Sequence, residues 1–322
     1  MLGATALRAG ANWLLRPAVG ASSRESAAAL ASLRILVGLL WLYNVSWKVP
    51  PDFGEASGNG VYGFLQDAVA NPVLPPFSWL VENVLLPNFT PFAWAVLVVE
   101  SLLAVMLLTG TLVRVAALIG IGQSLAIGLS VAFTPGEWPW AYWMMIGIHV
   151  VLLLTASGAA VAVDRVRAEA AQGRGQTAAL GLLRLWGAVV SGVALVALFL
   201  VIGTEPLASR GPSLGGPDLS ISLGSYNLLG ALGLLLMAGL MLAAAVFQRR
   251  ELALLAAVLG LVGALSVYAQ VASGNVWLGG TNTSAAFLLC AAVVSVVVVR
   301  WIDKPMGAVQ TGRFGRAGQS HA

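Results

Sequence analysis

Residues 92–133 read FAWAVLVVESLLAVMLLTGTLVRVAALIGIGQSLAIGLSVAF. Two apolar runs make up this stretch, and only Thr109-Gly110-Thr111 separates them. A helix needs about 20 residues to cross a hydrocarbon core about 30 Å thick, and each run approaches or reaches that length. One acidic residue, Glu100, interrupts the first run. The stretch therefore predicts a hairpin of two membrane-spanning helices.

The composition of the whole chain agrees with that hairpin. Hydrophobic residues make up 59% of the 322 residues and charged residues 9%, with a mean hydropathy of +0.89. Soluble domains carry about 25% charged residues, so lipid must cover much of this chain's surface. We expect an all-α integral membrane protein with about eight helices: Leu30–Trp47, Phe92–Leu108, Leu112–Phe133, Trp138–Thr155, Leu182–Gly203, Tyr226–Phe247, Leu252–Ala272 and Thr281–Ile302.

The basic residues set the expected orientation. With the N-terminus inside, 15 of the 17 Lys and Arg residues fall on the inner side, and only Lys48 and Arg210 fall outside. The positive-inside rule then places both termini in the cytoplasm. The basic residues stand in short clusters between apolar spans, so nucleic acid is not an expected partner. The expected partner is the lipid bilayer.

An Arg-rich inner segment divides the expected spans into two sets of four. The predicted domains are an interfacial segment 1–29, a four-helix domain 30–165, a cytoplasmic linker 166–181, a second four-helix domain 182–303 and a disordered tail 304–322. Trp138 precedes Asp164 by 26 residues, and Trp277 precedes Asp303 by the same 26. That spacing favours a diverged repeat. Coincidence is the alternative, because interfacial Trp residues and charged exits mark most membrane helices.

The segment 49–91 is the longest loop expected on the outer side. Proline and glycine punctuate it, while Val61–Ala70 and Phe77–Leu86 have apolar faces typical of short interfacial helices. Loops of this length are usually functional or disordered. We expect this one to cover the outer mouth of the first bundle.

Glu100 is the residue that most needs an explanation. An ionised carboxylate inside a span costs a few kcal/mol, so such acids face a bundle or a cavity and have a partner. The candidate partners are Arg34, Lys48, Arg114, Gln123 and His149. The functional interpretation is proton exchange or ligand binding, and the alternative is a structural hydrogen bond between helices.

Two helix faces carry further candidates. Helical spacing places Arg34, Gly38, Trp41, Val45 and Lys48 on one face, and Trp138, Tyr142, Met145 and His149 on another. An aromatic face that ends in histidine suits a quinone head group. The alternatives are snorkelling cations, an interfacial aromatic belt and a histidine that hydrogen-bonds between helices.

No metal, haem or nucleotide site is predicted. Cys290 is the only cysteine, and His149 and His321 are the only histidines, far apart in the chain. No thiolate cluster, dithiol or compact histidine pair can form within one copy.

The first half contains a series of motifs in a fixed order: Arg34-Ile35-Leu36-Val37-Gly38 with Tyr43 and Lys48, Glu82-Asn83-Val84-Leu85-Leu86-Pro87-Asn88, Glu100 with Leu107-Leu108-Thr109-Gly110, Arg114-Val115-Ala116-Ala117-Leu118, and Trp138-Pro139-Trp140 leading to Asp164. Together these motifs resemble the DoxX/DoxD family of bacterial membrane proteins. The resemblance covers about Leu30–Arg165. Trp277–Asn282 resembles a stretch before the final helix of some relatives, so the second half is either a diverged copy or an unrelated anchor.

The resemblance implies a multi-pass protein of the bacterial plasma membrane with a role in quinone-linked redox chemistry. One branch of the family, DoxD, is a subunit of thiosulfate:quinone oxidoreductase. The implied partners are a quinone and a second redox subunit. The expected catalytic residues are Glu100 and His149, the latter from spacing alone, and the expected substrate- or quinone-binding residues are Arg34, Lys48, Arg114, Trp138, Trp140 and Tyr142.

Two other function classes stay open at this point. One is a non-catalytic assembly or scaffold subunit of a membrane redox complex. The other is a small-solute or proton transporter, which parallel halves and an intramembrane acid would suit.

Overall fold

The computed structural model describes residues 2–302, with side chains from residue 6 onward. Within that range, seven helical segments are long and apolar enough to cross a membrane, which makes the chain a multi-pass α-helical membrane protein. They are α2 (Arg24–Ser46), the continuous segment Pro75–Thr109 that ends in α5 (Phe89–Thr109), α6 (Val113–Val131), α9 (Gly175–Val201), α10 (Leu228–Phe247), α11 (Arg250–Val271) and α12 (Asn282–Ile302).

One of the eight expected spans, Trp138–Thr155, is not among these seven segments. It forms α7 (Trp140–Leu154), an apolar helix of 15 residues. At 1.5 Å per residue this helix is about 22 Å long, shorter than a hydrocarbon core of about 30 Å. Pro139 precedes the helix, and Thr155 ends it in an extended conformation. The expected range Trp138–Thr155 is therefore helical only in its interior.

Several helices begin earlier than the apolar runs indicate. The Ser23 hydroxyl accepts a hydrogen bond from the Ser26 amide and caps α2 at Arg24, inside the segment assigned to the N-terminal region. The expected linker 166–181 is largely helical, because α8 (Val163–Ala171) occupies its first part and α9 begins at Gly175. Polar residues extend these helices beyond the apolar core, where a hydropathy pattern does not detect them.

The outer segment folds as expected into short helices. They are α3 (Gly60–Ala70) and α4 (Pro75–Leu80), and α4 continues through η1 (Val81–Leu85) and η2 (Leu86–Asn88) into α5. A cluster of buried side chains that includes Phe53, Leu65 and Leu97 packs this segment onto α5. The short helices are thus fixed to the bundle.

A β-hairpin was not expected, and it adds two short strands to a mostly helical fold. Strands β1 (Ser213–Gly216) and β2 (Ile221–Ser225) pair antiparallel across η3 (Pro217–Leu219). Gly215 has φ +104°, and a Cβ there would lie 2.1 Å from the Ile221 carbonyl oxygen. Only glycine fits that position of the hairpin.

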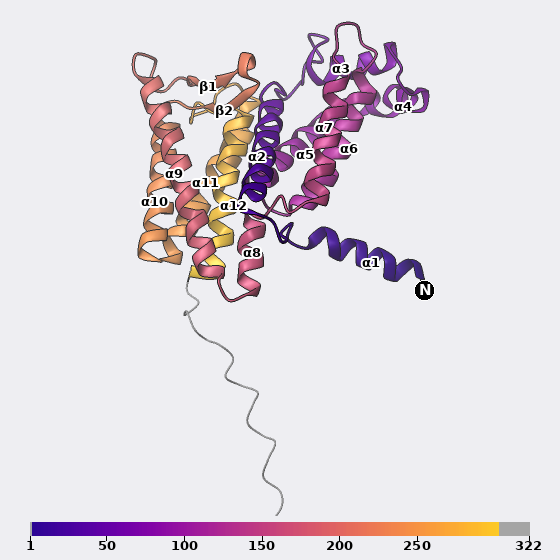
Figure 1. Ribbon diagram of the computed structural model, residues 1–322. Helices are drawn as coiled ribbons and strands as arrows, with labels where there is room; N and C mark the ends of the chain where they lie inside the picture. Colours follow the sequence, from indigo (N-terminus) through magenta and orange to yellow (C-terminus); the bar gives the residue numbers. More distant parts are fainter. Residues whose placement is uncertain (1, 303–322) are drawn as a thin grey trace, which may run out of the picture.

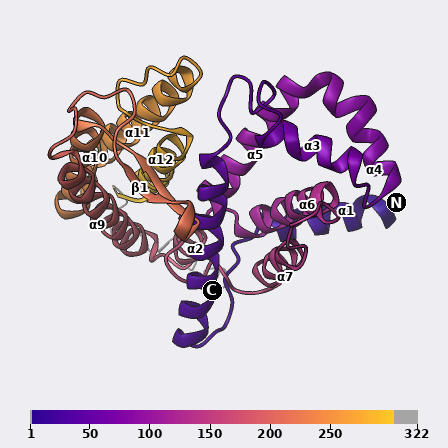
Figure 2. The same ribbon diagram turned by 90° about the horizontal axis from the view of Figure 1, so that it is seen from above.

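The helices form two groups on either side of α2. Figure 2 shows α9–α12 on one side and α3–α7 on the other. Helix α12 contacts both α2 and α5, so it joins the groups. Two hydrogen bonds reinforce the junction: the Tyr268 hydroxyl donates to Ser101 Oγ at 2.9 Å, and the Asn282 side-chain amide donates to the Lys48 carbonyl.

The connecting elements divide between the two ends of the bundle (Figure 1). Helices α3 and α4 lie at the same end as the β-hairpin, whereas α1 (Leu2–Leu15) and α8 lie at the opposite end. We call these the outer and inner ends, after the orientation that the charges predict. The expected disordered tail 304–322 and the pair Asp303-Lys304 used in the repeat argument lie outside the described residues.

Candidate functional site

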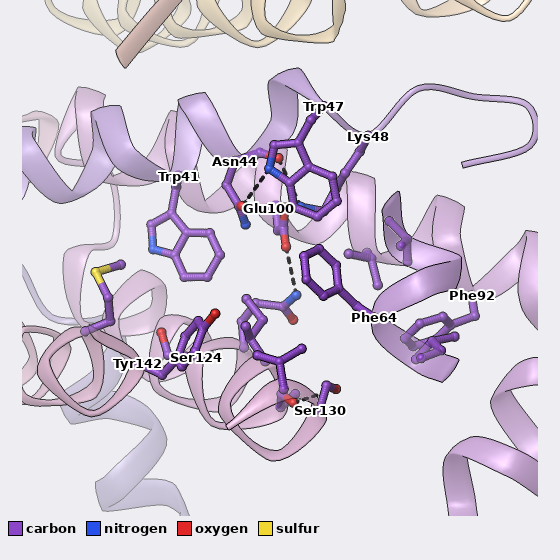
Figure 3. Close-up of a pocket in the computed structure, with 18 of the residues that line it drawn as sticks. Trp41, Asn44, Trp47, Lys48, Phe64, Phe92, Glu100, Ser124, Ser130 and Tyr142 are labelled. Atoms are coloured by element: carbon purple, nitrogen blue, oxygen red, sulfur yellow. Dashed lines mark hydrogen bonds and ion pairs between the residues drawn. The ribbon is translucent and has the colours of Figure 1, made fainter. Parts of the chain in front are cut away.

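A cavity of about 480 Å³ lies near the outer end of the first helix group, which comprises α2 and α3–α7. Helices α2, α5, α6 and α7 form its walls, and α3 and the helical segment after it close it from the outer side (Figure 3). Its lining is mostly apolar and aromatic: Leu40, Trp41, Trp47, Val61, Phe64, Leu65, Phe77, Leu85, Phe92, Val96, Ala126, Ile127, Val131 and Met145, with the polar residues Asn44, Lys48, Glu100, Gln123, Ser124, Ser130 and Tyr142. The outer segment thus covers the cavity, as its sequence predicts.

The most polar feature of the wall is an ion pair. Lys48 Nζ lies 2.6 Å from Glu100 Oε2, with side-chain exposures of 3% and 1%. Gln123 Nε2 donates to Glu100 Oε1 at 3.0 Å, and Lys48 Nζ also donates to the Asn44 carbonyl at 3.0 Å. The same ammonium lies 3.6 Å from the centre of the Trp47 ring. Of the five candidate partners of Glu100, the structure selects Lys48 and Gln123.

Three helices meet to form this cluster. Lys48 follows the end of α2, while Glu100 and Gln123 come from the interiors of α5 and α6. Removing two charges from water costs several kcal/mol per ion, and the pair persists because attraction and hydrogen bonds offset that cost. Loss of one partner would leave the other charge buried and uncompensated.

Three hydroxyl groups, those of Ser124, Ser130 and Tyr142, add to the polar part of the cavity. Ser124 is buried, and its Oγ has no hydrogen-bond partner within residues 2–302. The Tyr142 hydroxyl donates to Glu137 Oε2 at 2.6 Å. A buried polar atom without a partner calls for an explanation. In a cavity wall, a hydrogen bond to a ligand is one.

His149 does not line the cavity. Its Nε2 accepts from the Trp41 indole at 3.0 Å, and its Nδ1 lies 2.7 Å from the Met145 carbonyl. This arrangement fits the neutral ring with the proton on Nδ1. The ring packs against Gly120, where an added Cβ would lie 2.1 Å from it. Both nitrogens are engaged, which matches the alternative of a histidine that hydrogen-bonds between helices.

Arg34 lies at the inner end, away from Glu100. The fully buried guanidinium donates to five main-chain carbonyls, those of Leu107, Leu108, Ser157, Ala160 and Val161. These carbonyls belong to the end of α5 and to the turn after α7. Arg34 therefore joins two chain segments and has no donor directed into the cavity.

Asp164 and Arg114 are also at the inner end. Asp164 is fully buried and accepts from the amides of Ala18, Leu112 and Val113, and Arg167 donates to it at 2.9 Å. It thereby caps the start of α6.

Arg114 joins α6 to the chain around α1. Its guanidinium lies 4.7 Å from the Trp13 ring and donates to the Trp13 carbonyl at 3.3 Å. It is thus part of the inner surface and makes no contact with the cavity.

Trp138 and Trp140 stand at the outer start of α7. Their rings pack edge to face with centroids 4.9 Å apart, and they are 68% and 48% exposed. Neither lines the cavity. This placement is typical of an interfacial aromatic belt.

Sequence reasoning missed most of the aromatic wall. Trp47 and Phe64 face the cavity from the end of α2 and from α3 (Figure 3). Trp47 stands at the end of a span and Phe64 lies in an amphipathic helix. No sequence pattern distinguishes them from aromatic residues that anchor helices at the membrane interface. The signal that was available is the aromatic content of the outer segment.

The mostly apolar cavity with a few polar groups in its wall can hold an amphiphilic molecule. Within the described residues, no group of three or more His, Cys, Asp or Glu side chains is placed to hold a metal ion. Comparison with protein-family models, with curated proteins and with solved structures gives no match for this chain.

Proposed function

We propose that the chain is a DoxX/DoxD-type membrane subunit that binds a quinone in the outer cavity and takes part in quinone-linked redox chemistry. The observation that carries the proposal is an apolar, aromatic cavity with one buried ion pair in its wall. Small-molecule sites typically have volumes of about 300–1,000 Å³, are mostly apolar and contain a few polar groups that fix orientation. The order of the sequence motifs in the first half supports the proposed membership in the DoxX/DoxD family.

The side chains around the ion pair suit a quinone head group. The Lys48 ammonium is a donor for a quinone carbonyl, and Glu100 holds that ammonium against the wall. Gln123 in turn holds Glu100, and the unpartnered Ser124 hydroxyl offers a second donor. Trp41 and Trp47 supply aromatic surface beside them. A bound quinone would supply the electron acceptor, and the Lys48–Glu100 pair would hold or move protons at its carbonyl oxygens.

Electrons must come from outside the described chain. A soluble donor of the thiosulfate class, or a second redox subunit, would deliver them.

We further propose the plasma membrane of a bacterium, with both termini in the cytoplasm and the helices in two four-helix bundles. Within the described residues, Lys48 and Arg210 are the exceptions to the placement of Lys and Arg at the inner end, which supports this orientation. A reporter inserted at Gly58 should read external, and one inserted at Gly173 should read cytoplasmic. A cytoplasmic signal at Gly58 would contradict the orientation.

Ligand binding can be tested by titration with a short-chain quinone. Decylubiquinone should quench tryptophan fluorescence of the purified protein saturably, because Trp41 and Trp47 line the cavity. Ala126→Phe fills the cavity and should abolish the saturable part. Ala95→Phe is the matched control, since Ala95 is exposed on α5 and does not line the cavity. Equal quenching of wild type and Ala126→Phe would contradict the proposal.

A scaffold subunit is the second candidate, favoured by one contact. The Lys48 carbonyl accepts a hydrogen bond from Asn282, so the residue that lines the cavity also joins the two helix groups.

Thiosulfate-dependent quinone reduction distinguishes the quinone-binding redox subunit from the scaffold. Membranes of the source organism lacking the chain should regain activity with the wild type, with a raised KM for quinone in the Lys48→Met, Glu100→Gln double variant, which leaves no buried charge uncompensated. Activity that does not depend on the chain would favour the scaffold.

A further inference from the structure

A second cavity lies at the inner end, between α8 and the first turns of α9. Its volume is about 450 Å³, and Figure 1 shows the two helices side by side at that end. One wall is charged and comprises Arg165, Glu169 and Arg174. The other wall belongs to α9 and includes Gly181, Leu182 and Leu185. Nothing in the proposed quinone chemistry uses this cavity.

The charged wall has a surplus positive charge. Arg174 Nε pairs with Glu169 Oε2 at 2.7 Å, so these two charges compensate each other. Arg165 is exposed and forms no hydrogen bond or ion pair with another residue of the described chain. A guanidinium that is free beside a cavity is a binding group for a phosphate, because its planar fork matches two phosphate oxygens.

The apolar wall continues into the membrane-facing surface. Leu185 is 41% exposed, and Val189 lies one turn further along α9 at 43%. Since α9 is long and apolar enough to span a bilayer, these side chains face acyl chains. A free phosphate would gain nothing from that strip, whereas a lipid would gain buried apolar area.

We propose that this inner cavity is a binding site for an anionic phospholipid of the inner leaflet. The phosphodiester binds Arg165, and the acyl chains run along Leu185 and Val189 of α9. Basic pockets between membrane helices on the cytoplasmic side bind anionic head groups in this way. The site lies on the junction between α8 and α9, so the lipid would stabilise the connection between the two helix groups.

The test is native mass spectrometry of the delipidated protein with added lipid. Phosphatidylglycerol should bind as a discrete adduct, and phosphatidylcholine should bind more weakly. Arg165→Gln should lower the apparent affinity for phosphatidylglycerol about tenfold, as expected for one charge-assisted contact. Gly181→Phe should weaken binding as well, because no atom lies within 4 Å of a Cβ built there and the ring would enter the cavity.

The control is Arg249→Gln, an exposed inner arginine outside the cavity, which should leave the affinity unchanged. Equal losses in Arg165→Gln and Arg249→Gln would overturn the site. Competition by inorganic phosphate at concentrations equal to those of the lipid would overturn the lipid assignment. Decylubiquinone binding should be unchanged in Arg165→Gln, so failure of this proposal is distinguishable from failure of the quinone site.

Discussion

Two clusters of buried charge lie at opposite ends of the first helix group. The inner cluster contains Arg34 and Asp164, and the outer cluster contains Lys48 and Glu100. All four residues are almost completely inaccessible, so burial alone does not distinguish them. Their partners do. Main-chain carbonyls surround Arg34, and main-chain amides surround Asp164, whereas Lys48 and Glu100 depend mainly on each other and on Gln123.

Under the proposed function, the difference separates structural from functional charge. Main-chain partners are fixed by the fold, and an arginine that binds five carbonyls has no capacity left for a ligand. Side-chain partners can rearrange, and Lys48 and Glu100 of the outer cluster line the large outer cavity. A buried charge in a membrane protein is a default candidate for a functional site. Here that expectation favours the outer cluster, which lines the cavity, over the inner one.

The largest expected effect is that of Arg34→Leu. The substitution would leave several buried carbonyls without donors, and we expect the free energy of unfolding to fall by about 3–5 kcal/mol. Unfolding in detergent with increasing denaturant measures it. Arg34→Lys keeps the charge without the planar fork and should recover only part of the loss. A stability of Arg34→Leu within about 1 kcal/mol of wild type would contradict a structural role.

The outer cluster should behave differently in a double-mutant cycle. Lys48→Met alone leaves Glu100 uncompensated, and we expect a loss of about 3–5 kcal/mol. Adding Glu100→Gln should restore most of the stability, because a neutral amide can keep the hydrogen bond with Gln123. The double variant should nevertheless bind quinone poorly. Additive losses in the cycle would show that the two side chains act independently. That result would contradict the account of the outer cluster as a coupled ion pair.

Ser124→Ala should have the smallest effect on stability. Its hydroxyl has no partner within residues 2–302, so the free energy of unfolding should change by less than about 0.5 kcal/mol. Quinone affinity should fall about threefold to tenfold if the hydroxyl binds the head group. Ser130→Ala is the control, since that cavity hydroxyl already donates to the Ala126 carbonyl at 2.9 Å. Equal affinities of the two variants would remove Ser124 from the site.

The fold was largely predictable because hydropathy reports directly on lipid contact. All eight apolar runs are helical, and the short helices of the outer segment are present. The β-hairpin was missed since its strands are only 4 and 5 residues long and contain glycine. The shortness of α7 was missed because Trp138 is apolar and extends the hydropathy pattern, although it is not part of the helix.

The site was predictable only in part. Glu100 and Lys48 were both singled out, but five residues remained possible partners for Glu100. The choice depends on how α2, α5 and α6 are rotated about their axes, and that rotation is set by packing. His149 shows the same limit. Its helical spacing from Tyr142 suggested a residue on the ligand-binding face, but the Trp41 indole donates to His149 Nε2, which a ligand would need.

The central claim is that the outer cavity holds a quinone. The most direct measurement is solvent extraction of the protein, purified in mild detergent from a quinone-containing host, followed by chromatographic quantification of quinone per chain. We expect quinone in the wild type and in Ala95→Phe at equal levels, and little in Ala126→Phe. The same quinone content in all three proteins, at the level carried by an unrelated membrane protein, would contradict the account.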